Sequence, residues 1–291
     1  MIDKEIIIKN FSKYAKYYDQ YSDIQNLCAL KLINRIETDN FAVFSQGQEG
    51  FIRILDVGCG TGNYTKLLRN KFQTAQIKAM DISGEMIQIA KKKLKHKEIE
   101  FIVADGETIN FRERFDIISS NVSFQWFENL EKTLFKYKEL LNLNGSIIFS
   151  IFGPLTFFEL EKSLKETFKE HEQITAHNFI KKQDMEKILR RLFNEVEIEE
   201  EILKEKYASL LDLLKTIKYT GTRGNGIMAG TPWSLNTITE LENIYRKEFS
   251  AQKGKIITTY QVFFCRGSKI LKDKTLKGKF QELRVYPFIL S

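Results

Sequence analysis

Three glycines at alternate positions follow an acidic residue in the stretch ILDVGCGTGNYTKLL, residues 54–68. The pattern before them is typical of a buried strand that ends at Asp56, and the pattern after Gly62 is typical of a helix. Gly58, Gly60 and Gly62 let the backbone turn sharply and let a ligand approach it without a clash with Cβ atoms. We expect the helix N-terminus and free backbone N–H groups to face that ligand.

The spacing of the glycines separates two kinds of ligand. Dinucleotide-binding loops have the pattern G-x-G-x-x-G, whereas this loop has G-x-G-x-G, with Cys59 between the first two glycines. Asp56 would repel a pyrophosphate but suits an ammonium group, and S-adenosylmethionine carries an ammonium, a carboxylate and a sulfonium. The pattern D-x-G-x-G-x-G resembles the S-adenosylmethionine-binding loop of class I methyltransferases. The resemblance implies that Asp56 helps to hold the ammonium group, directly or through water.

The end of the next predicted strand continues the pattern. Asp81 lies nineteen residues beyond Gly62 (81 − 62), where an acidic residue hydrogen-bonds the ribose hydroxyls in nucleotide-binding α/β folds. We expect Ile82 to belong to the same site and Met86, on the following helix, to pack on the adenine.

The third and fourth predicted strands end in VADGETINF and ISSNVSFQWF. In class I methyltransferases a carboxylate or polar residue after the third strand meets the adenine amino group. The resemblance assigns this role to Asp105, with Gly106 allowing close approach. Asn121, at the end of the fourth strand, is expected beneath the methionine moiety, at the edge where open α/β sheets bind ligands.

Short apolar strands alternate with helices through the chain, which predicts a doubly wound α/β sheet. By resemblance to class I methyltransferases, we expect a Rossmann-like sheet of seven strands, mostly parallel with an antiparallel last strand. The strands are expected at residues 51–57, 76–81, 99–105, 115–121, 145–153, 195–207 and 255–267. The later helices are expected at residues 84–94, 128–141, 155–168, 182–193, 210–219 and 235–249.

Apolar residues at three- and four-residue spacing predict a further helical segment over residues 10–36, with a break near residues 19–23. We therefore divide the chain into three parts. Residues 1–50 form an N-terminal helical cap and linker, and residues 51–268 form the methyltransferase domain, with a lid insertion at about residues 207–250 before the last strand. Residues 269–291 form a basic C-terminal tail.

The charge and composition limit the possible partners. The formal net charge of +7 favours an acidic partner, although a generally lysine-rich composition explains it equally well. No basic stripe with interleaved aromatic residues is present, so nucleic acid is an unlikely partner. The three cysteines lack metal-ligand spacing, and we expect no metal. No apolar run approaches the roughly 18–20 residues that span a membrane, and the apolar stretch near the N-terminus is too short for a secretory signal. We expect a soluble, cytoplasmic protein.

Segments outside the glycine loop resemble the malonyl-[acyl-carrier protein] O-methyltransferases of biotin synthesis. The opening NFSKYAKYYDQYSDIQNLCALKLI, residues 10–33, matches the opening of that family through Phe11, Ala15, Tyr18, Asp19 and Gln25. The stretch SSNVSFQWF, residues 119–127, matches its S-N-x-x-x-Q-W segment through Ser120, Asn121, Gln125 and Trp126. Weaker matches are Leu214, Lys215, Ile217, Thr259 and Tyr260, and Lys218 departs from the family, which has glycine there.

The resemblance implies methyl transfer from S-adenosylmethionine to the free carboxylate of a malonyl thioester on the acidic acyl carrier protein. With a pKa of roughly 4, a carboxylate is ionised at pH 7 and needs no base. This agrees with the lack of a convincing histidine or carboxylate pair near the fourth strand. The implied lid residues are Tyr18 and Gln25, which close over the cofactor, and Tyr18 also orients the acceptor.

The implied substrate contacts are of two kinds. The amide of Gln125 and the indole of Trp126 position groups, and a cation pairs with the malonyl carboxylate, for which Lys215 and Arg223 are candidates. Three alternatives stay open: a methyltransferase of another small carboxylic acid or metabolite, a protein of this fold that binds a partner without catalysis and, with the weakest support, a nucleic-acid methyltransferase.

Overall fold

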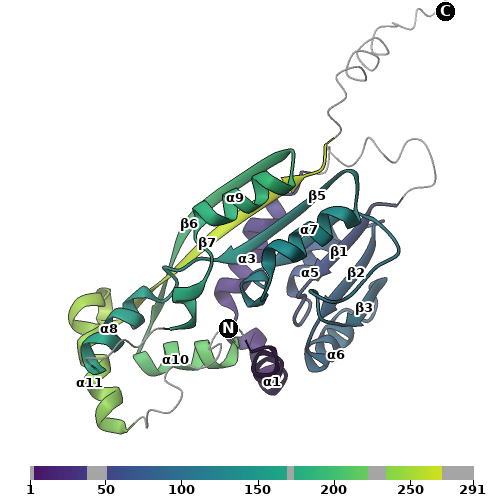
Figure 1. Ribbon diagram of the computed structural model, residues 1–291. Helices are drawn as coiled ribbons and strands as arrows, with labels where there is room; N and C mark the ends of the chain where they lie inside the picture. Colours follow the sequence, from purple (N-terminus) through teal and green to yellow (C-terminus); the bar gives the residue numbers. More distant parts are fainter. Residues whose placement is uncertain (1–2, 38–50, 169–173, 222–233, 271–291) are drawn as a thin grey trace, which may run out of the picture.

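The computed structural model describes residues 3–37, 51–168, 174–221 and 234–270. Seven strands form one sheet in the order β3-β2-β1-β4-β5-β7-β6 (Figure 1). The strands are β1 (Arg53–Val57), β2 (Gln76–Asp81), β3 (Ile99–Val103), β4 (Phe115–Asn121), β5 (Leu141–Phe152), β6 (Glu195–Tyr207) and β7 (Ile256–Ser268). The pairings from β3 to β5 are parallel, and β7 runs antiparallel to both β5 and β6. The predicted fold is confirmed.

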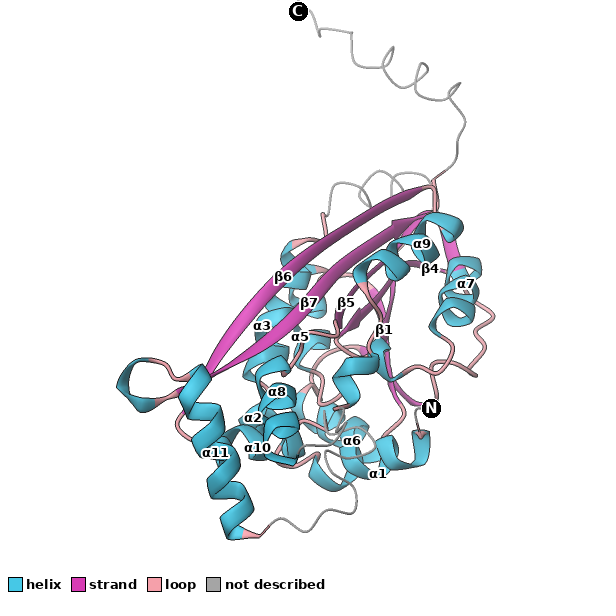
Figure 2. Ribbon diagram, turned by 60° about the vertical axis from the view of Figure 1, so that its left-hand side comes forward, coloured by secondary structure: helices cyan, strands magenta, loops and turns pink. Residues whose placement is uncertain are grey.

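Helices pack on both faces of the sheet (Figure 2). The α-helices of the described residues are α1 (Lys4–Tyr14), α2 (Tyr18–Tyr21), α3 (Asp23–Asn34), α5 (Asn63–Lys71), α6 (Gly84–Lys93), α7 (Leu130–Leu140), α8 (Phe158–Phe168), α9 (Lys182–Leu192), α10 (Leu210–Tyr219) and α11 (Leu235–Phe249). Neighbouring residues of β1 show how the two faces divide, because Ile54 belongs to the apolar cluster of α3 and α5 whereas Leu55 belongs to that of α7 and α9. Successive strand residues point to opposite faces, so one short apolar strand contributes to both clusters.

The N-terminal helices begin earlier than predicted. Helix α1 begins at Lys4 rather than at residue 10, because the carboxylate of Asp3 accepts hydrogen bonds from the N–H groups of Glu5 and Ile6. This is a helix N-cap, which satisfies donors that have no partner within the helix. The helical segment is interrupted between α1 and α2 and again at Ser22, close to the predicted break.

The strands β6 and β7 extend beyond the rest of the sheet towards α8 and α11 (Figures 1 and 2). Helices α10 and α11 lie between them in the sequence, so they occupy the segment that we predicted as a lid insertion. Helix α10 packs against α1 and α2. The carboxyl ends of β1, β2 and β4 therefore meet a cover made of segments from opposite ends of the chain.

Candidate active site

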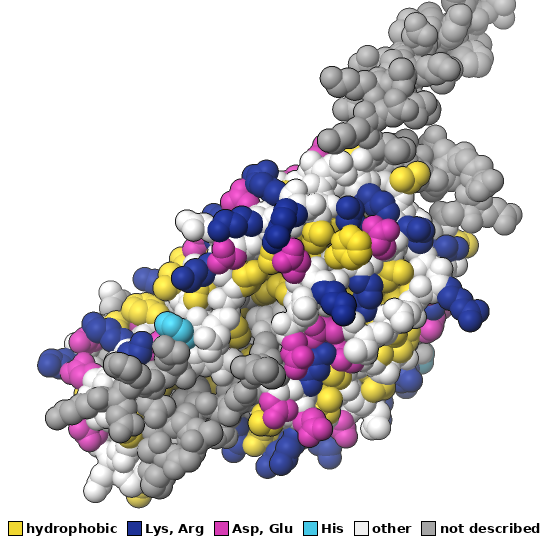
Figure 3. Space-filling view, viewed as in Figure 1, with side chains coloured by type: hydrophobic (Ala, Val, Ile, Leu, Met, Phe, Trp, Pro, Cys, Tyr) yellow, Lys and Arg dark blue, Asp and Glu magenta, His cyan; other side chains and the backbone are white. Residues whose placement is uncertain are grey.

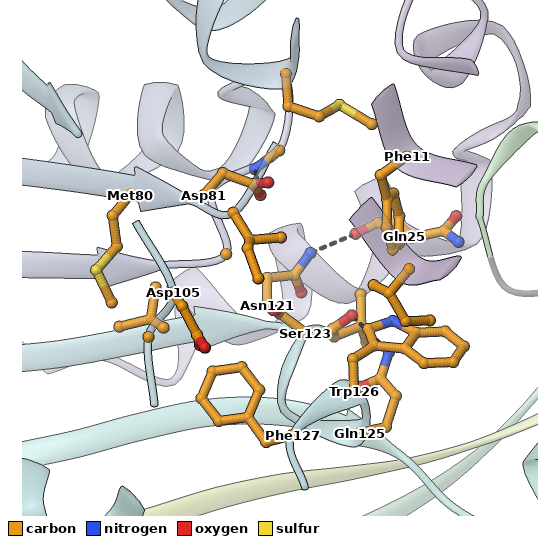
Figure 4. Close-up of a pocket in the computed structure, with 18 of the residues that line it drawn as sticks. Phe11, Gln25, Met80, Asp81, Asp105, Asn121, Ser123, Gln125, Trp126 and Phe127 are labelled. Carbon is orange, nitrogen blue, oxygen red and sulfur yellow. Dashed lines mark hydrogen bonds between the residues drawn. The ribbon is translucent and has the colours of Figure 1, made fainter. Parts of the chain in front are cut away.

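A cavity lies at the carboxyl ends of β1, β2, β4 and β5, with α1 on one side (Figure 4). Including the open space at its mouth and between its lining atoms, it measures about 830 Å³. Most of the predicted cofactor residues line it, namely Tyr18, Gln25, Gly58, Gly60, Asp81, Ile82, Met86, Asp105, Gly106 and Asn121. The predicted substrate residues Gln125 and Trp126 line it as well.

The glycine loop contributes space to this cavity. Gly58 and Gly60 have φ values of +71° and +53°, which L-residues with a side chain rarely adopt. A Cβ on Gly58 would lie 2.0 Å from Ser123 Oγ, whereas a Cβ on Gly60 would meet nothing within 4 Å. Gly60 therefore leaves open room at the wall of the cavity.

The N–H groups of the loop are not free, contrary to our expectation. Those of Gly58 and Cys59 donate to the carbonyl oxygen of Met80, over 2.8 and 2.9 Å. That of Gly60 donates to Asp81 Oδ2 over 2.9 Å. The donors hold the loop against the end of β2, because a buried N–H group without a partner would be costly.

Asp56 lies behind the loop and is not on the cavity wall. Its carboxyl group is fully buried, and Oδ2 accepts a hydrogen bond of 2.6 Å from Thr65 Oγ1 on α5. Burial raises the pKa of Asp56 to about 7, although the bond from Thr65 opposes the shift. Oδ1 has no hydrogen-bond partner among the described residues. The carboxylate of Asp56 is therefore not among the groups that line the cavity.

Two other predicted loop residues also lie off the cavity wall. Cys59 is buried in a small apolar cluster with Ala79 and Ile87. Gly62, at φ +85°, precedes α5, and a Cβ there would come within 3.2 Å of Ala90 on α6. Cys59 and Gly62 thus serve the packing of the loop and the helices around it.

Asp81 presents a fixed carboxylate to the cavity. Oδ2 accepts the N–H group of Gly60, and Oδ1 accepts that of Ser83 over 2.8 Å. Burial raises the pKa of Asp81, and the two backbone donors partly offset this shift. A carboxylate can accept about four hydrogen bonds, so each oxygen retains capacity for a ligand hydroxyl.

Lys4 is a site residue that our sequence analysis missed. Its ammonium group on α1 lies 2.6 Å from Asp105 Oδ2 and 2.7 Å from Glu107 Oε2, and Lys4 and Asp105 both line the cavity. Burial by itself lowers the pKa of Lys4, but the hydrogen bonds to the two carboxylates outweigh it and raise the pKa. These contacts fasten α1 to the segment that follows β3.

Contacts within the protein require a residue without a side chain at Gly106, next to Asp105. A Cβ there would lie 2.8 Å from the hydroxyl oxygen of Tyr137 and 2.9 Å from the ring of Phe127. The Tyr137 hydroxyl also donates to the carbonyl oxygen of Gly106 over 2.8 Å. These two side chains thus approach Gly106 closely, in addition to the close approach of the cofactor that we predicted there.

Asn121 links the end of β4 to the N-terminal helices. Its Nδ2 donates to the carbonyl oxygen of Gln25 over 2.9 Å (dashed line in Figure 4), and its Oδ1 accepts from Ser150 Oγ over 2.8 Å. Tyr18, at the start of α2, also lines the cavity. Burial, followed by the nearby charge of Asp81, raises the pKa of Tyr18, so its phenol is protonated at neutral pH.

Aromatic rings and an amide form the opposite side of the cavity from Asp81 and Asp105 (Figure 4). The ring of Trp126 packs edge-on against Phe11, with 6.3 Å between centroids. Gln125 Nε2 donates to the carbonyl oxygen of Val122 over 2.6 Å, and Gln125 Oε1 is buried without a partner among the described residues. The structure therefore leaves one acceptor unpaired on this side.

Of the two predicted carboxylate-binding cations, the structure describes Lys215. Lys215 is exposed on α10, lies 3.4 Å from Asp212 and does not line the cavity, so it cannot pair with a ligand there in this structure. Arg223 lies outside the described residues. Among the described residues no group of three His, Cys, Asp or Glu side chains could hold a metal ion. No helix in the described ranges is long and apolar enough to cross a membrane.

Comparisons with known proteins place the chain in a family. Residues 55–149 match a family described as a methyltransferase domain. A malonyl-[acyl-carrier protein] O-methyltransferase 2 from Ilyobacter polytropus is 36% identical over 269 residues, which cover 92% of this chain and 99% of that protein. A malonyl-[acyl-carrier protein] O-methyltransferase from Bacillus cytotoxicus is 30% identical over 97% of this chain and 99% of its own length.

The chain belongs to the malonyl-[acyl-carrier protein] O-methyltransferase family. The resemblance inferred from its motifs is thereby confirmed. Solved structures support the fold alone: the YcgJ protein from Bacillus subtilis is 14% identical and superposes with a TM-score of 0.54, covering 81% of this chain and all of that one. As a member of this family the chain is an O-methyltransferase.

Methyltransferases of this fold use S-adenosylmethionine, and the described cavity fits that cofactor. The open Cβ position of Gly60 leaves room for a ligand against the loop. Asp81 and Asp105 supply acceptors on one side, where hydroxyl and amino donors would bind (Figure 4). Gln125 Oε1, unpaired within the described part of the chain, offers a further acceptor on the other side, which suits the ammonium of an amino acid.

Proposed function

We propose that this protein transfers the methyl group of S-adenosylmethionine to the free carboxylate of a malonyl thioester on acyl carrier protein. The product would be a methyl ester that primes pimeloyl synthesis for biotin. The observation that carries the proposal is the similarity to malonyl-[acyl-carrier protein] O-methyltransferases over more than nine-tenths of the chain. The cavity, which joins the glycine loop to the more specific Q-W segment, supports it.

In this proposal the cofactor residues have distinct roles. Asp81 accepts hydrogen bonds from the ribose hydroxyls, because its orientation is already fixed by two backbone N–H groups. Asp105 meets the adenine amino group, and Ile82 and Met86 pack on the adenine ring. Asp56 acts through a water molecule or through Thr65, since its carboxylate lies behind the loop.

The methionine side of the cofactor would lie near Gln25 and Asn121. The hydrogen bond from Asn121 to the carbonyl oxygen of Gln25 ties α3 to the end of β4. Gly58 and Gly60 give the backbone conformation that leaves room for this moiety. The phenol of Tyr18, protonated at neutral pH, can donate a hydrogen bond to the acceptor carboxylate and orient it.

For this methyl transfer the protein mainly has to align the methyl donor with the acceptor and to exclude water. When bound, S-adenosylmethionine supplies a methyl group made electrophilic by the sulfonium. The malonyl carboxylate is already ionised, so no residue has to remove a proton. The rings of Phe11 and Trp126 would shield the reacting atoms, and Gln125 would hold the groups beside them. A cation for the acceptor carboxylate is still required, and Arg223 remains a candidate.

The proposed division of the chain follows from these roles. Residues 1–50 and the insertion at about 207–250 would form the lid of a methyltransferase domain that spans 51–268, and residues 269–291 would form a tail outside it. Because the proposed partner takes part in fatty-acid synthesis, we also propose that the protein acts in the cytoplasm.

The test is transfer of radiolabelled methyl groups from S-adenosylmethionine to malonyl-acyl carrier protein, with acetyl- and succinyl-acyl carrier proteins as controls. We expect base-labile label on the malonyl form and none on the acetyl form, which has no free carboxylate. Labelling of none of the three by protein that still binds S-adenosylhomocysteine would refute the proposed acceptor. It would favour the alternative, a methyltransferase of another small carboxylic acid or metabolite.

A further inference from the structure

Helix α1 has two faces of different chemistry. Lys4, Ile7 and Phe11 line the cavity, at the three- and four-residue spacing of one helix face. Lys9 and Lys13 are four residues apart and exposed, so they share a face that points away from the cavity. This helix covers the site with one side and presents positive charge to the solvent with the other.

Helix α10 repeats this arrangement. Leu213 and Ile217 are buried, and Thr220, directly after the helix, lines the cavity. Lys215 and Lys218 are three residues apart and exposed on the other side. The position of Lys215, which excludes it from the cavity, places it on this outer face.

An aromatic cluster joins the two helices, so that their outer faces form one surface. The ring centroid of Tyr219 lies 5.4 Å from that of Tyr14 and 4.6 Å from that of Tyr21. The ammonium groups of Lys13 and Lys218 lie 5.6 and 5.5 Å from the centroid of the same ring, Tyr14. Two lysines that are 205 residues apart in the sequence (218 − 13 = 205) therefore lie close to the same ring.

We call the exposed cations of this surface the lid lysines: Lys9, Lys13, Lys16, Lys215 and Lys218. Within the described residues, Lys215 has an ion pair, with Asp212, and no ion pair is found for the other four. Glu5 is the acidic residue exposed on the same side of α1. At the lower edge of the molecule, in the region of α1 and α6, basic side chains gather with acidic ones among them (Figure 3). Four of the five lid lysines thus have no ion pair within the described part of the chain.

We propose that the lid lysines form the docking surface for the acidic face of the carrier protein. This inference rests on the proposed function and adds the place at which the partner binds. A protein docked on the outer face of α1 and α10 would hold its thioester arm beside the two helices that cover the cavity. Opposite charges raise the rate of encounter and fix the orientation of the partner, and salt weakens both effects.

The test is the kinetics of the double variant Lys13→Glu/Lys218→Glu. We expect the KM for malonyl-acyl carrier protein to rise at least tenfold at low salt, and its dependence on salt to diminish. The kcat/KM for a malonyl thioester of a short carrier-free thiol should stay within twofold, because that substrate does not touch the lid surface. A second variant, Lys9→Glu/Lys16→Glu, tests the same surface at side chains for which the described residues show no ring contact.

The matched control is Lys187→Glu/Arg190→Glu, which changes the net charge by the same amount on α9, away from α1 and α10 (Figure 1). It should leave the KM for the carrier substrate unchanged. Equal KM values for wild type and both lid variants would overturn the docking surface while the proposed function stands. Wild-type protein that methylates neither the carrier-bound nor the carrier-free malonyl thioester would overturn the function, and this inference with it.

Discussion

Replacement of Asp81 by asparagine is the most direct test of the cofactor site. In the wild type, Asp81 Oδ2 and Oδ1 accept the N–H groups of Gly60 and Ser83, over 2.9 and 2.8 Å. Asparagine has one side-chain oxygen, so one of these donors would face an NH₂ group instead. The variant would also lose the negative charge that, in our proposal, accepts hydrogen bonds from the ribose hydroxyls.

The expected increase in the Kd for S-adenosylhomocysteine follows from the hydrogen bond that the variant loses. A hydrogen bond to a charged group contributes about 1.5–3 kcal/mol. Loss of one such bond to the cofactor, about 2 kcal/mol, corresponds to a roughly 30-fold increase in Kd. Titration calorimetry with S-adenosylhomocysteine measures this directly, and the thermal unfolding temperature of each variant shows whether the fold is retained.

Asp116→Asn is the matched control. Asp116 Oδ2 accepts the N–H group of Arg53 over 2.8 Å, and its Oδ1 accepts from Asn142 Nδ2 over 2.8 Å. These bonds lie at the amino ends of β1, β4 and β5, at the other end of the strands from the cavity. This substitution should alter stability but not the Kd. If folded Asp81→Asn protein bound S-adenosylhomocysteine within threefold of wild type, Asp81 would not be a ligand of the cofactor.

Three further substitutions test the loop, the buried acid and the lid. Gly60→Val should abolish cofactor binding in calorimetry, because the backbone has φ +53° and the side chain would fill open space at the cavity wall; normal affinity would contradict this. Asp56 has a pKa of about 7 in the folded protein against an ordinary value of 3.8, so the folded state binds more protons between these pH values. The free energy of unfolding of the wild type, measured with urea, should therefore fall by up to about 1.4 kcal/mol per pH unit from about pH 4 to 7. Asp56→Asn should lose this dependence on pH. Equal pH dependence in the two proteins would refute the raised pKa of Asp56. Lys4→Met removes two ion pairs and should raise the Kd for S-adenosylhomocysteine about tenfold, which corresponds to a binding free energy weaker by about 1.4 kcal/mol. Lys9→Met, on the exposed face of the same helix, should leave this Kd unchanged.

Local patterns predicted the elements well where one pattern dominates. The strands at residues 76–81, 115–121 and 195–207 and the helices at 210–219 and 235–249 have the predicted bounds. These are runs with clear periodicity, followed by a change of composition. The orientation of Lys215 was also within reach of the sequence, because a lysine two residues after Leu213 and two before Ile217 lies off the buried face of a helix.

The parts that failed depend on contacts between distant residues. Lys4 and Asp105 are 101 residues apart, and no local pattern connects them. The loop N–H groups were expected to be free, but the partner of Gly58 and Cys59 is a carbonyl oxygen on the next strand. Asp56 was expected to act on the ammonium group directly or through water, and its contact with the side chain of Thr65 was not foreseen. In each case the fold, and no local pattern, decides which groups become partners.

The two faces of the lid lead to one more prediction. The inner face of α1 touches the cavity through Lys4 and Phe11, and its outer face carries Lys9 and Lys13. If both ligands favour the closed position of this helix, each must tighten the other by the same factor, because coupling free energies are reciprocal. S-adenosylhomocysteine should lower the Kd for the carrier protein about fivefold, and saturating carrier protein should lower the Kd for S-adenosylhomocysteine equally.

Calorimetric titration in both orders measures the two factors. Lys4→Met should reduce both towards one, because it weakens the attachment of α1 to the segment after β3 without changing the outer lysines. Independent binding in wild type would mean that α1 is held closed whether or not a ligand is present. The lid lysines could then still bind the partner, but they would not transmit its presence to the cofactor.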